Sequence, residues 1–339
     1  MDQQAFLGTI YTRRMRPSEI FTDPLVDLGA EDPALAGILA PRNHAALPKV
    51  GVTAQFLENA GEYHRRYFDT SYWSLVLGHA LDTIGPGHAP RVILDIGSGS
   101  GNSVIPLADR FPAAHIVATD ISAPLLAILR DFLKARPDAG RFTLACVDAT
   151  RASYFAGVAD LAVGAAILHH LLEPERVLAS CFEALAPGGW AIFFEPFEAG
   201  NLFLKTGYQR ILGKASCEER ASPAMKLLQG IVVDYEVRSR PRSDPVFREI
   251  DDKWMFTRTW FERLRDAQGW AAVVTYPLHS GAHVLRNQAT VHLRLGAGLA
   301  PEALPAWAWA ILDEMDGGLS EDLRSELAQE AAILLRKPG

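Results

Sequence analysis

The stretch from residue 91 to residue 102 constrains the fold more than any other part of the chain. An apolar run ends at Asp95, and a helical pattern begins at Ser103. Three glycines lie between them at alternate positions: Gly97, Gly99 and Gly101. A strand, a tight glycine turn and a helix start, in this order, form a ligand-binding crevice at the carboxyl edge of a parallel sheet. Glycine lets the backbone approach a ligand closely and adopt a positive φ angle.

Two residues indicate which ligand this loop binds. The dinucleotide fingerprint G-x-G-x-x-G, counted from Gly97, needs a glycine where this chain has Asn102. Asp95 stands beside the loop, where a carboxylate would repel a diphosphate but would suit a positively charged ligand without phosphate. S-Adenosylmethionine (SAM) carries a sulfonium and an ammonium group, so it is the expected cofactor. An NAD(P)-dependent oxidoreductase is the less favoured alternative.

The D-x-G-x-G-x-G spacing of residues 95–101 resembles motif I of the class I SAM-dependent methyltransferases. Asp120 ends an expected strand about 20 residues beyond the loop, where an acid accepts hydrogen bonds from ribose hydroxyls. Its carboxylate also suits the N-cap of a helix that begins at Ala123. We therefore expect Asp95, the three glycines and Asp120 to contact the cofactor.

The resemblance implies further cofactor contacts at the ends of the following strands. These residues are Ile121, Asp148, Ala149 and Gly164. In the resembled family, the acid in the place of Asp148 and the backbone after it hold the adenine amino group. The small size of Gly164 is expected to leave room beside the reactive methyl. The alternative for Asp148 is a solvent-exposed turn residue.

The resemblance and the order of apolar runs together predict an α/β fold. Its doubly wound, Rossmann-like sheet has seven mostly parallel strands, with residues 289–295 as an antiparallel strand beside 270–276. We expect four regions: an N-terminal helical lid at 1–90, a SAM-binding core at 91–196 and 246–296, a cap insertion at 197–245 over the acceptor site, and a C-terminal helical hairpin at 297–339. The second helix of that hairpin is expected to run from Ser320 to Arg336.

Candidate catalytic residues follow the fourth and fifth strands of this core. The phrase L-H-H-L-x-x-P at residues 168–174 recurs in small-molecule branches of the resembled superfamily. His169 is the preferred general base and His170 the alternative, because an imidazole titrates near neutral pH. Either histidine otherwise caps the next helix or packs under the loop. Glu195 is expected to orient the acceptor or the histidine.

Candidate substrate-binding residues come from the lid and the cap. The helical pattern from Thr53 to Phe68 places aromatic side chains on one face. It forms either a lid over the site or a helix packed on the core with its charges in solvent. The candidates are Tyr63, Arg66 and Tyr67 from the lid, with Glu198 and Tyr208 from the cap.

Composition excludes several partners and compartments. The 339 residues carry a net charge of −7, so no basic field attracts nucleic acid. Three scattered cysteines predict neither a disulfide framework nor a zinc site, and Gly281 between His279 and His283 indicates a loop there and no metal. No signal sequence is visible, and no apolar run approaches the ~18 residues that span a bilayer. We expect a cytoplasmic protein without membrane contact, whose terminal hairpin packs on the core or on a second copy in a homodimer.

These observations predict a SAM-dependent methyltransferase that acts on a small-molecule acceptor. Oxygen is the favoured methylated atom, with sulfur, nitrogen and carbon left open, and the reaction is expected to be metal-independent. A magnesium-dependent enzyme would need clustered carboxylates after the fourth strand, where this chain has Gly-Ala-Ala-Ile-Leu-His-His. The alternative of another class is a SAM-binding regulatory subunit that transfers no methyl group.

Overall fold

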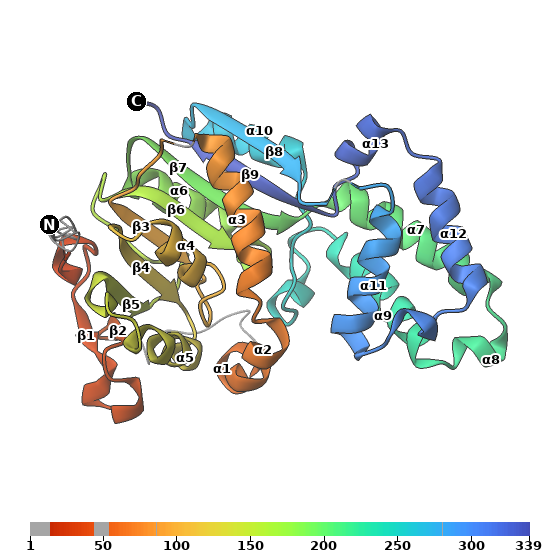
Figure 1. Cartoon of the computed structure of the whole chain (residues 1–339), viewed down its shortest axis with the longest axis horizontal. Helices are drawn as coiled ribbons and strands as arrows, with labels where there is room; N and C mark the ends of the chain where they lie inside the picture. The colour runs from red at the N-terminus through yellow and green to blue at the C-terminus, as the bar shows by residue number, and fades with distance from the viewer. Residues whose placement is uncertain (1–13, 44–53, 86, 280) are drawn as a thin grey trace, which may run out of the picture.

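The structure is a computed structural model that describes residues 14–43, 54–85, 87–279 and 281–339. Parts of the predicted N-terminal lid, residues 1–13 and 44–53, lie outside these ranges. The described residues form one mixed sheet with helices on both faces, and a group of helices beyond the sheet (Figure 1). None of the helices in the described part of the chain is both long and apolar enough to span a membrane.

The sheet has nine strands in the order β1-β2-β5-β4-β3-β6-β7-β9-β8. The strands are β1 (Leu25–Asp27), β2 (Leu39–Pro41), β3 (Val92–Ile96), β4 (His115–Asp120), β5 (Phe142–Cys146), β6 (Ala159–Ala165), β7 (Leu185–Pro196), β8 (Ala272–Pro277) and β9 (Glu330–Arg336). Strands β5, β4, β3, β6 and β7 are parallel, and β9 runs antiparallel to both β7 and β8. The predicted doubly wound, Rossmann-like fold is confirmed, with β1 and β2 as an additional hairpin at one edge.

The strand order places the glycine loop at the centre of the sheet. β3 pairs with β4 on one side and with β6 on the other, so the chain leaves β3 where the winding direction reverses. Ligands of open α/β sheets bind at such a switch point because the loops on either side diverge there. All five residues of β3 are buried, which explains its uninterrupted apolar pattern up to Asp95.

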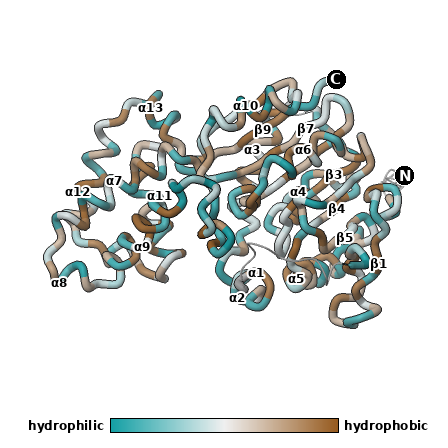
Figure 2. Tube along the Cα trace, turned by 180° about the vertical axis from the view of Figure 1, so that it is seen from behind, coloured by the Kyte–Doolittle hydropathy of each residue, from teal (hydrophilic) through white to brown (hydrophobic). Residues whose placement is uncertain are grey.

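Helices cover both faces of the sheet and bury its apolar side chains. One face packs against α3 (Thr70–Ile84), α4 (Val104–Arg110) and α5 (Ala123–Lys134). The other packs against α6 (Pro174–Ala184) and α10 (Arg258–Gln268). Hydrophobic residues accordingly gather along the central strands (Figure 2). Two short helices, α1 (Ala54–Leu57) and α2 (Ala60–Tyr67), precede α3 and lie beside α5.

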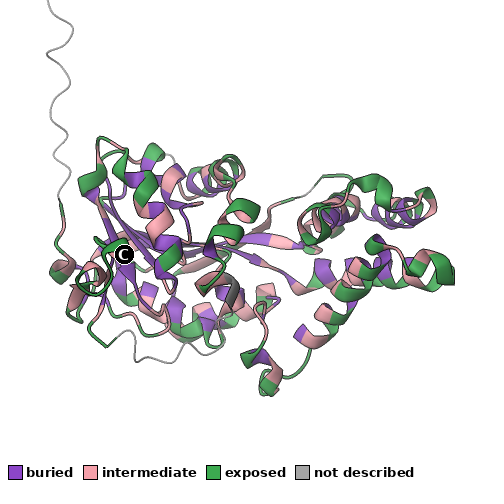
Figure 3. Ribbon diagram, turned by 90° about the horizontal axis from the view of Figure 1, so that it is seen from below, coloured by how far each residue is buried: buried purple, intermediate pink, exposed green. Residues whose placement is uncertain are grey.

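Four helices form a second hydrophobic core, which we call the helical module. They are α7 (Glu198–Lys214), α9 (Pro223–Arg238), α11 (Val284–Ala297) and α12 (Ala306–Gly317). Their buried faces meet one another at one side of the sheet domain (Figure 3). The short helices α8 (Cys217–Arg220) and α13 (Glu321–Glu326) lie in its connections. The predicted cap insertion therefore shares its core with segments that were expected in the sheet domain and in the C-terminal hairpin.

Two secondary-structure predictions in the C-terminal part were wrong. Residues 289–295 lie in α11, where Leu285, Ala289 and Leu293 are buried at helical spacing on the face toward the module. The predicted helix up to Arg336 ends at Glu326, and Glu330–Arg336 forms β9. Five consecutive residues of β9 are fully covered because the strand lies between β7 and β8. A short apolar run of this kind fits a buried strand as well as a buried helix.

Gly200→Ala is expected to destabilise the protein, because Gly200 lies where α7 touches the chain that leads into β9. A Cβ atom there would overlap the carbonyl oxygens of Leu327 and Ala328, which are backbone atoms and cannot turn away. Overpacking of this kind costs about 3 kcal/mol. Gly213→Ala in the same helix is the matched control, since no heavy atom lies within 4 Å of its added Cβ. The control should gain about 0.5–1 kcal/mol from helix propensity.

Chemical denaturation of both variants measures this difference. Equal unfolding free energies for the two alanine variants would show that α7 does not press against the 327–328 backbone as described.

Candidate active site

Two adjoining cavities open at the carboxyl edge of the sheet. The glycine-loop cavity has a volume of about 260 Å³ and is lined by the loop after β3, by Asp120 and by residues of α1 and α2. The His169 cavity has a volume of about 240 Å³ and lies between the ends of β6 and β7 and the helical module. Ala166 lines both cavities. It is the one non-glycine residue with a positive φ angle, 59°, in the described part of the chain.

The three loop glycines have different neighbours. A Cβ atom at Gly97 would lie 2.7 Å from Ile167, and one at Gly101 would lie 2.7 Å from Leu129, so these two glycines permit close packing. Gly99, with a φ angle of 51°, lines the glycine-loop cavity and has no heavy atom within 4 Å of a Cβ position. A side chain there would occupy space that is open to a ligand. Gly99 therefore forms the ligand-facing wall of the loop.

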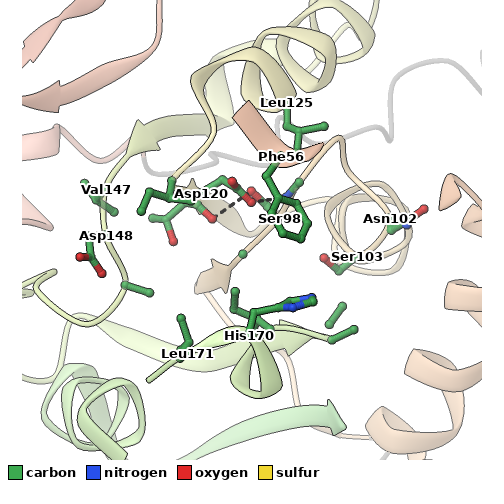
Figure 4. Close-up of a pocket in the computed structure, with 18 of the residues that line it drawn as sticks. Phe56, Ser98, Asn102, Ser103, Asp120, Leu125, Val147, Asp148, His170 and Leu171 are labelled. Atoms are coloured by element: carbon green, nitrogen blue, oxygen red, sulfur yellow. Dashed lines mark hydrogen bonds between the residues drawn. The ribbon is translucent and has the colours of Figure 1, made fainter. Parts of the chain in front are cut away.

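Asp120 lies at the end of β4 and faces the glycine-loop cavity, with Phe56 and His170 pointing into the same space (Figure 4). One carboxylate oxygen accepts a 2.8 Å hydrogen bond from the Gly99 amide and the other a 2.8 Å bond from the Ser122 amide. Burial raises the pKa of Asp120, while these backbone donors lower it. Each oxygen keeps a lone pair for a further donor, which a ribose hydroxyl would supply.

The remaining predicted cofactor residues divide into lining and supporting ones. Ile121, Asp148 and Ala149 line the glycine-loop cavity. One carboxylate oxygen of Asp148 accepts bonds from the Thr150 amide and hydroxyl, at 2.9 and 2.7 Å, so it also orders its own turn. Asp95 and Gly164 do not line the cavity. Asp95 is fully buried behind the loop, and burial raises its pKa to about 7.

Gly164 lies within β6 and permits packing there. A Cβ atom at this position would overlap the ring of Phe193 and lie 2.8 Å from Ile167. Its small size therefore brings the end of β6 close to β7, which differs from the predicted role of leaving room at the methyl group.

Helix α2 covers the glycine-loop cavity with aromatic side chains. Tyr63 and Tyr67 both line it, with their ring centroids 4.8 Å apart, and Phe56 of α1 contacts Tyr63. His64, which sequence reasoning did not single out as a ligand-binding residue, also lines it and contacts the Ser100 hydroxyl at 2.8 Å. Arg66 is exposed and donates a hydrogen bond to the carbonyl of Leu295 in α11. Arg66 thus links α2 to the helical module and does not line either cavity.

Glu195 holds the turn that carries both candidate histidines. The amides of Ile167 and Leu168 donate to one carboxylate oxygen at 3.1 and 2.7 Å. The other oxygen accepts the His169 amide at 3.1 Å and lies 2.7 Å from His169 Nδ1. Only 1% of the surface of Glu195 is exposed, and its carboxylate contacts these four donor groups of three residues. The short contact to the carboxylate places a proton on Nδ1 and leaves Nε2 of His169 directed elsewhere.

The adjacent histidines face different cavities. His169 lines the His169 cavity, and its Nε2 lies 3.5 Å from Asp252. Burial lowers the pKa of His169, but Glu195 and Asp252 outweigh burial and raise it to about 9. His170 lines the glycine-loop cavity, and burial together with the charge on His169 lowers its pKa to about 3. His170 is therefore neutral over the whole physiological range.

Asp252 connects these histidines to the helical module. It lies 3.3 Å from Nδ1 of His170 and 3.7 Å from the guanidinium of Arg238 in α9. Donor atoms of His169, His170 and Asp252 all lie within 4.8 Å of one another, a spacing that a metal ion could bridge. The Arg238 guanidinium competes with a cation for the same carboxylate, so we interpret the group as a charge network.

Comparisons with known proteins match part of this chain to methyltransferases. Residues 93–189 match the family model described as a methyltransferase domain. Demethylmenaquinone methyltransferase of Thermus thermophilus is 33% identical over 128 residues, which are 37% of this chain and 57% of the relative. Trans-aconitate 2-methyltransferase of Variovorax paradoxus is 43% identical over 101 residues, which are 30% of this chain and 36% of the relative. The alignments thus span just over half of one relative and about a third of the other.

Residues 93–189 thus form a methyltransferase domain. SAM is the cofactor expected for such a domain. The fold also resembles a solved structure, a chain from the complex between the Haloferax volcanii Trm112 methyltransferase activator and a methyltransferase. The TM-score is 0.50 at 13% sequence identity, and the match covers 85% of this chain and 100% of that chain.

The glycine-loop cavity has open space beside Gly99, where SAM would bind. The side-chain position of Gly99 is empty on the cavity side, and Asp120 keeps acceptor capacity at the same wall. The described residues therefore fit SAM in the glycine-loop cavity.

The two predicted cap residues, Tyr208 and Glu198, lie outside both cavities. Tyr208 is fully buried in the helical module, and its hydroxyl contacts Nδ1 of His292 at 2.8 Å. His292 itself lines the His169 cavity. Glu198 is half-buried at the start of α7 and lines neither cavity.

Sequence reasoning missed several residues of the His169 cavity because they come from distant segments. They are Tyr72, Trp73, Arg238, Asp252, Gln288, His292 and Glu330. The pair Asp251-Asp252 directly after the cap was the one visible signal, since acids beside apolar segments often face a site.

Proposed function

We propose that this protein transfers the methyl group of SAM to a hydroxyl oxygen of a small molecule bound in the His169 cavity. The observation that carries the proposal is the meeting of the two cavities at Ala166, with His169 on the acceptor side. Methyl transfer is an in-line displacement, so the protein contributes proximity, alignment and exclusion of water. A cavity of about 240 Å³ favours a small acceptor.

The cofactor side relies on residues that line the glycine-loop cavity. The Gly99 backbone would form the wall against SAM, Asp120 would accept from ribose hydroxyls, and Asp148 with Ala149 would hold the adenine end. Bound there, SAM supplies an electrophilic methyl group on a sulfonium. Tyr63 and Tyr67 would cover the site and exclude water, since their rings already line it.

A hydroxyl acceptor needs a base, and His169 is the candidate. Glu195 fixes the imidazole with its proton on Nδ1, so a neutral His169 can take the acceptor proton on Nε2. Glu195 is a positioning residue in this scheme because its oxygens are engaged by the turn. Asp252 favours the protonated imidazole, so the base becomes effective only when Nε2 has lost its proton.

The competing proposal is a SAM-binding protein without methyl transfer. The second cavity, with its Glu195–His169 pair, favours an enzyme because a cofactor-binding regulator has no use for an oriented base. Incubation with SAM and a fractionated small-molecule extract would separate the two. Formation of S-adenosylhomocysteine and a methylated small molecule supports the enzyme, whereas SAM binding without turnover in every fraction contradicts it. We expect unchanged turnover after chelation of metal ions.

Asp120→Ala is expected to weaken SAM binding by about 1–3 kcal/mol. The substitution removes the acceptor of the ribose hydroxyls and leaves the Gly99 and Ser122 amides without their partner. Isothermal titration of SAM into the folded variant measures the change. Ser153→Ala, which alters an exposed side chain in neither cavity, is the control. Unchanged SAM affinity in Asp120→Ala would remove Asp120 from the cofactor site.

A further inference from the structure

The charges around the His169 cavity do not balance. Three of its lining residues carry carboxyl groups: Glu195, Asp252 and Glu330. Glu195 is engaged by the turn that it holds and by His169. Asp252 lies beside both histidines and Arg238. Two of the three carboxylates thus already have cationic or donor neighbours within the protein.

The cationic groups of the cavity, Arg238 and His169, contact other acids: Glu195, Asp252 and Asp234. Arg238 contacts Asp234 at 3.2 Å and Asp252 at 3.7 Å, and it donates to the Trp254 carbonyl at 2.7 Å. His169 is held between Glu195 and Asp252. His292, on the α11 side, contacts Tyr208 and is neutral because burial lowers its pKa to about 4. None of these groups forms a salt bridge with Glu330 in the described part of the chain, and His169 acts on it only from beyond salt-bridge distance.

Glu330 is the unbalanced acid. It begins β9 opposite Pro196, at the same sheet edge as Glu195. Its carboxylate accepts a hydrogen bond from the Tyr72 hydroxyl, and no lysine or arginine forms a salt bridge with it in the described part of the chain. Burial raises the pKa of Glu330 and the charge of Glu195 adds to this, whereas His279 and His169 lower it. Glu330 is half-buried, and a partly desolvated carboxylate whose hydrogen-bond donor is neutral gains from an added positive charge.

Aromatic side chains lie beside this acid. Tyr72 and Trp73 of α3 both line the cavity, with ring centroids 5.5 Å apart, and Tyr235 of α9 lines it as well. Trp73 in turn packs edge-on against Phe194 at 5.6 Å. Aromatic faces attract cations through the negative potential of the π system and also accept an apolar ring or chain. The wall therefore combines a carboxylate that has no salt bridge in the described part of the chain with aromatic surfaces that suit the body of an organic amine.

We infer that the methyl acceptor is a small hydroxylated amine, whose ammonium group binds the Glu330 carboxylate in the His169 cavity while its hydroxyl faces His169. This inference rests on the proposed function, because it assigns the His169 cavity to the acceptor. Amino alcohols and phenolic amines have the required pair of groups. A carboxylated acceptor of the same shape would be repelled by Glu330. Glu330 is accordingly a specificity-determining residue.

Three phenols of similar size test the charge preference. Tyramine carries an ammonium group at about pH 7.5, 4-ethylphenol carries no charge, and 3-(4-hydroxyphenyl)propionate carries a carboxylate. Each is titrated calorimetrically into protein saturated with S-adenosylhomocysteine. We expect tyramine to bind about tenfold or more tightly than either analogue. Equal affinities, tighter binding of the carboxylate, or no binding of tyramine at millimolar concentration would overturn the inference.

Glu330→Gln tests the assignment to this residue. The amide keeps the shape and the contact to Tyr72 but removes the charge, so the preference for tyramine should disappear while SAM affinity stays unchanged. Glu326→Gln in α13 removes an exposed charge nearby and should preserve the preference. A preference that survives Glu330→Gln would mean that another group binds the ammonium.

Turnover measurements separate this inference from the proposed function. If the protein prefers tyramine but forms no S-adenosylhomocysteine with any acceptor, the ammonium-binding site is supported and methyl transfer is contradicted. If only uncharged or acidic acceptors are methylated, methyl transfer is supported and the ammonium-binding site is contradicted.

Discussion

Replacing His169 with alanine is expected to slow methyl transfer by about 10²–10⁴-fold at pH 9, the usual contribution of a positioned base. SAM affinity should be nearly unchanged, because His169 lines the His169 cavity and not the glycine-loop cavity. Steady-state turnover with the identified acceptor, combined with SAM titration, measures both quantities. The rate difference should shrink as the pH approaches the pKa of the acceptor, since solvent then removes the proton.

The pH dependence of the unmodified protein follows from the same residue. Only neutral His169 accepts a proton, and the pKa of His169 is raised to about 9 by Glu195 and Asp252 against the effect of burial. The value of kcat/KM should therefore rise with pH, by about 50-fold between pH 7 and pH 9, and then level off. His170→Ala is the control, because His170 stays neutral and its loss should leave the rising limb of the kcat/KM profile in place. A flat profile in the unmodified protein would contradict the role of His169 as the base.

Glu195→Gln is expected to reduce kcat by about 10²–10⁴-fold through the imidazole that Glu195 orients. The amide can accept at one oxygen only, while three backbone amides and His169 Nδ1 all point at this side chain. At least one donor would then face the new NH₂ group. Without the Glu195 charge the pKa of His169 should fall, so the rising limb of kcat/KM should move below pH 9.

The shift of the limb distinguishes positioning from a loss of folding. Glu198→Gln, at the start of α7 and outside both cavities, should keep the limb near pH 9 and keep its rate. If Glu195→Gln lowered the rate but left the limb unchanged, Glu195 would act on the structure of the turn and not on the histidine.

Local sequence patterns predicted the residues that line the glycine-loop cavity. The strand, glycine loop and helix start at residues 91–103 need only near neighbours to form, and Asp120 follows from the length of one β-α-β step. Asp120, Ile121, Asp148 and Ala149 line the cavity as placed, although their contacts with SAM remain predictions. Tyr63 and Tyr67, predicted to bind the substrate, line this cavity and not the His169 cavity, because one helical face brings both to the same wall.

Other roles depend on packing partners that are distant in sequence. A larger residue at Gly101 would overlap Leu129, and one at Gly164 would overlap Phe193. A sequence motif does not reveal these neighbours. Arg66 was read as a ligand contact but reaches the end of α11, 229 residues away. His169 and His170 are adjacent in sequence but line different cavities, because a tight turn points neighbouring side chains in different directions.

The sequence by itself determined the doubly wound methyltransferase core, because alternating apolar runs and glycine turns specify β-α steps locally. Only the tertiary structure decided that residues 330–336 form a strand between β7 and β8, and that residues 284–297 join the helical module. Short apolar segments are compatible with helix or strand until their burial partners are known. The same holds for the acceptor side: Glu195, Asp252 and Glu330 meet around His169 only after three separate segments have folded against one sheet edge.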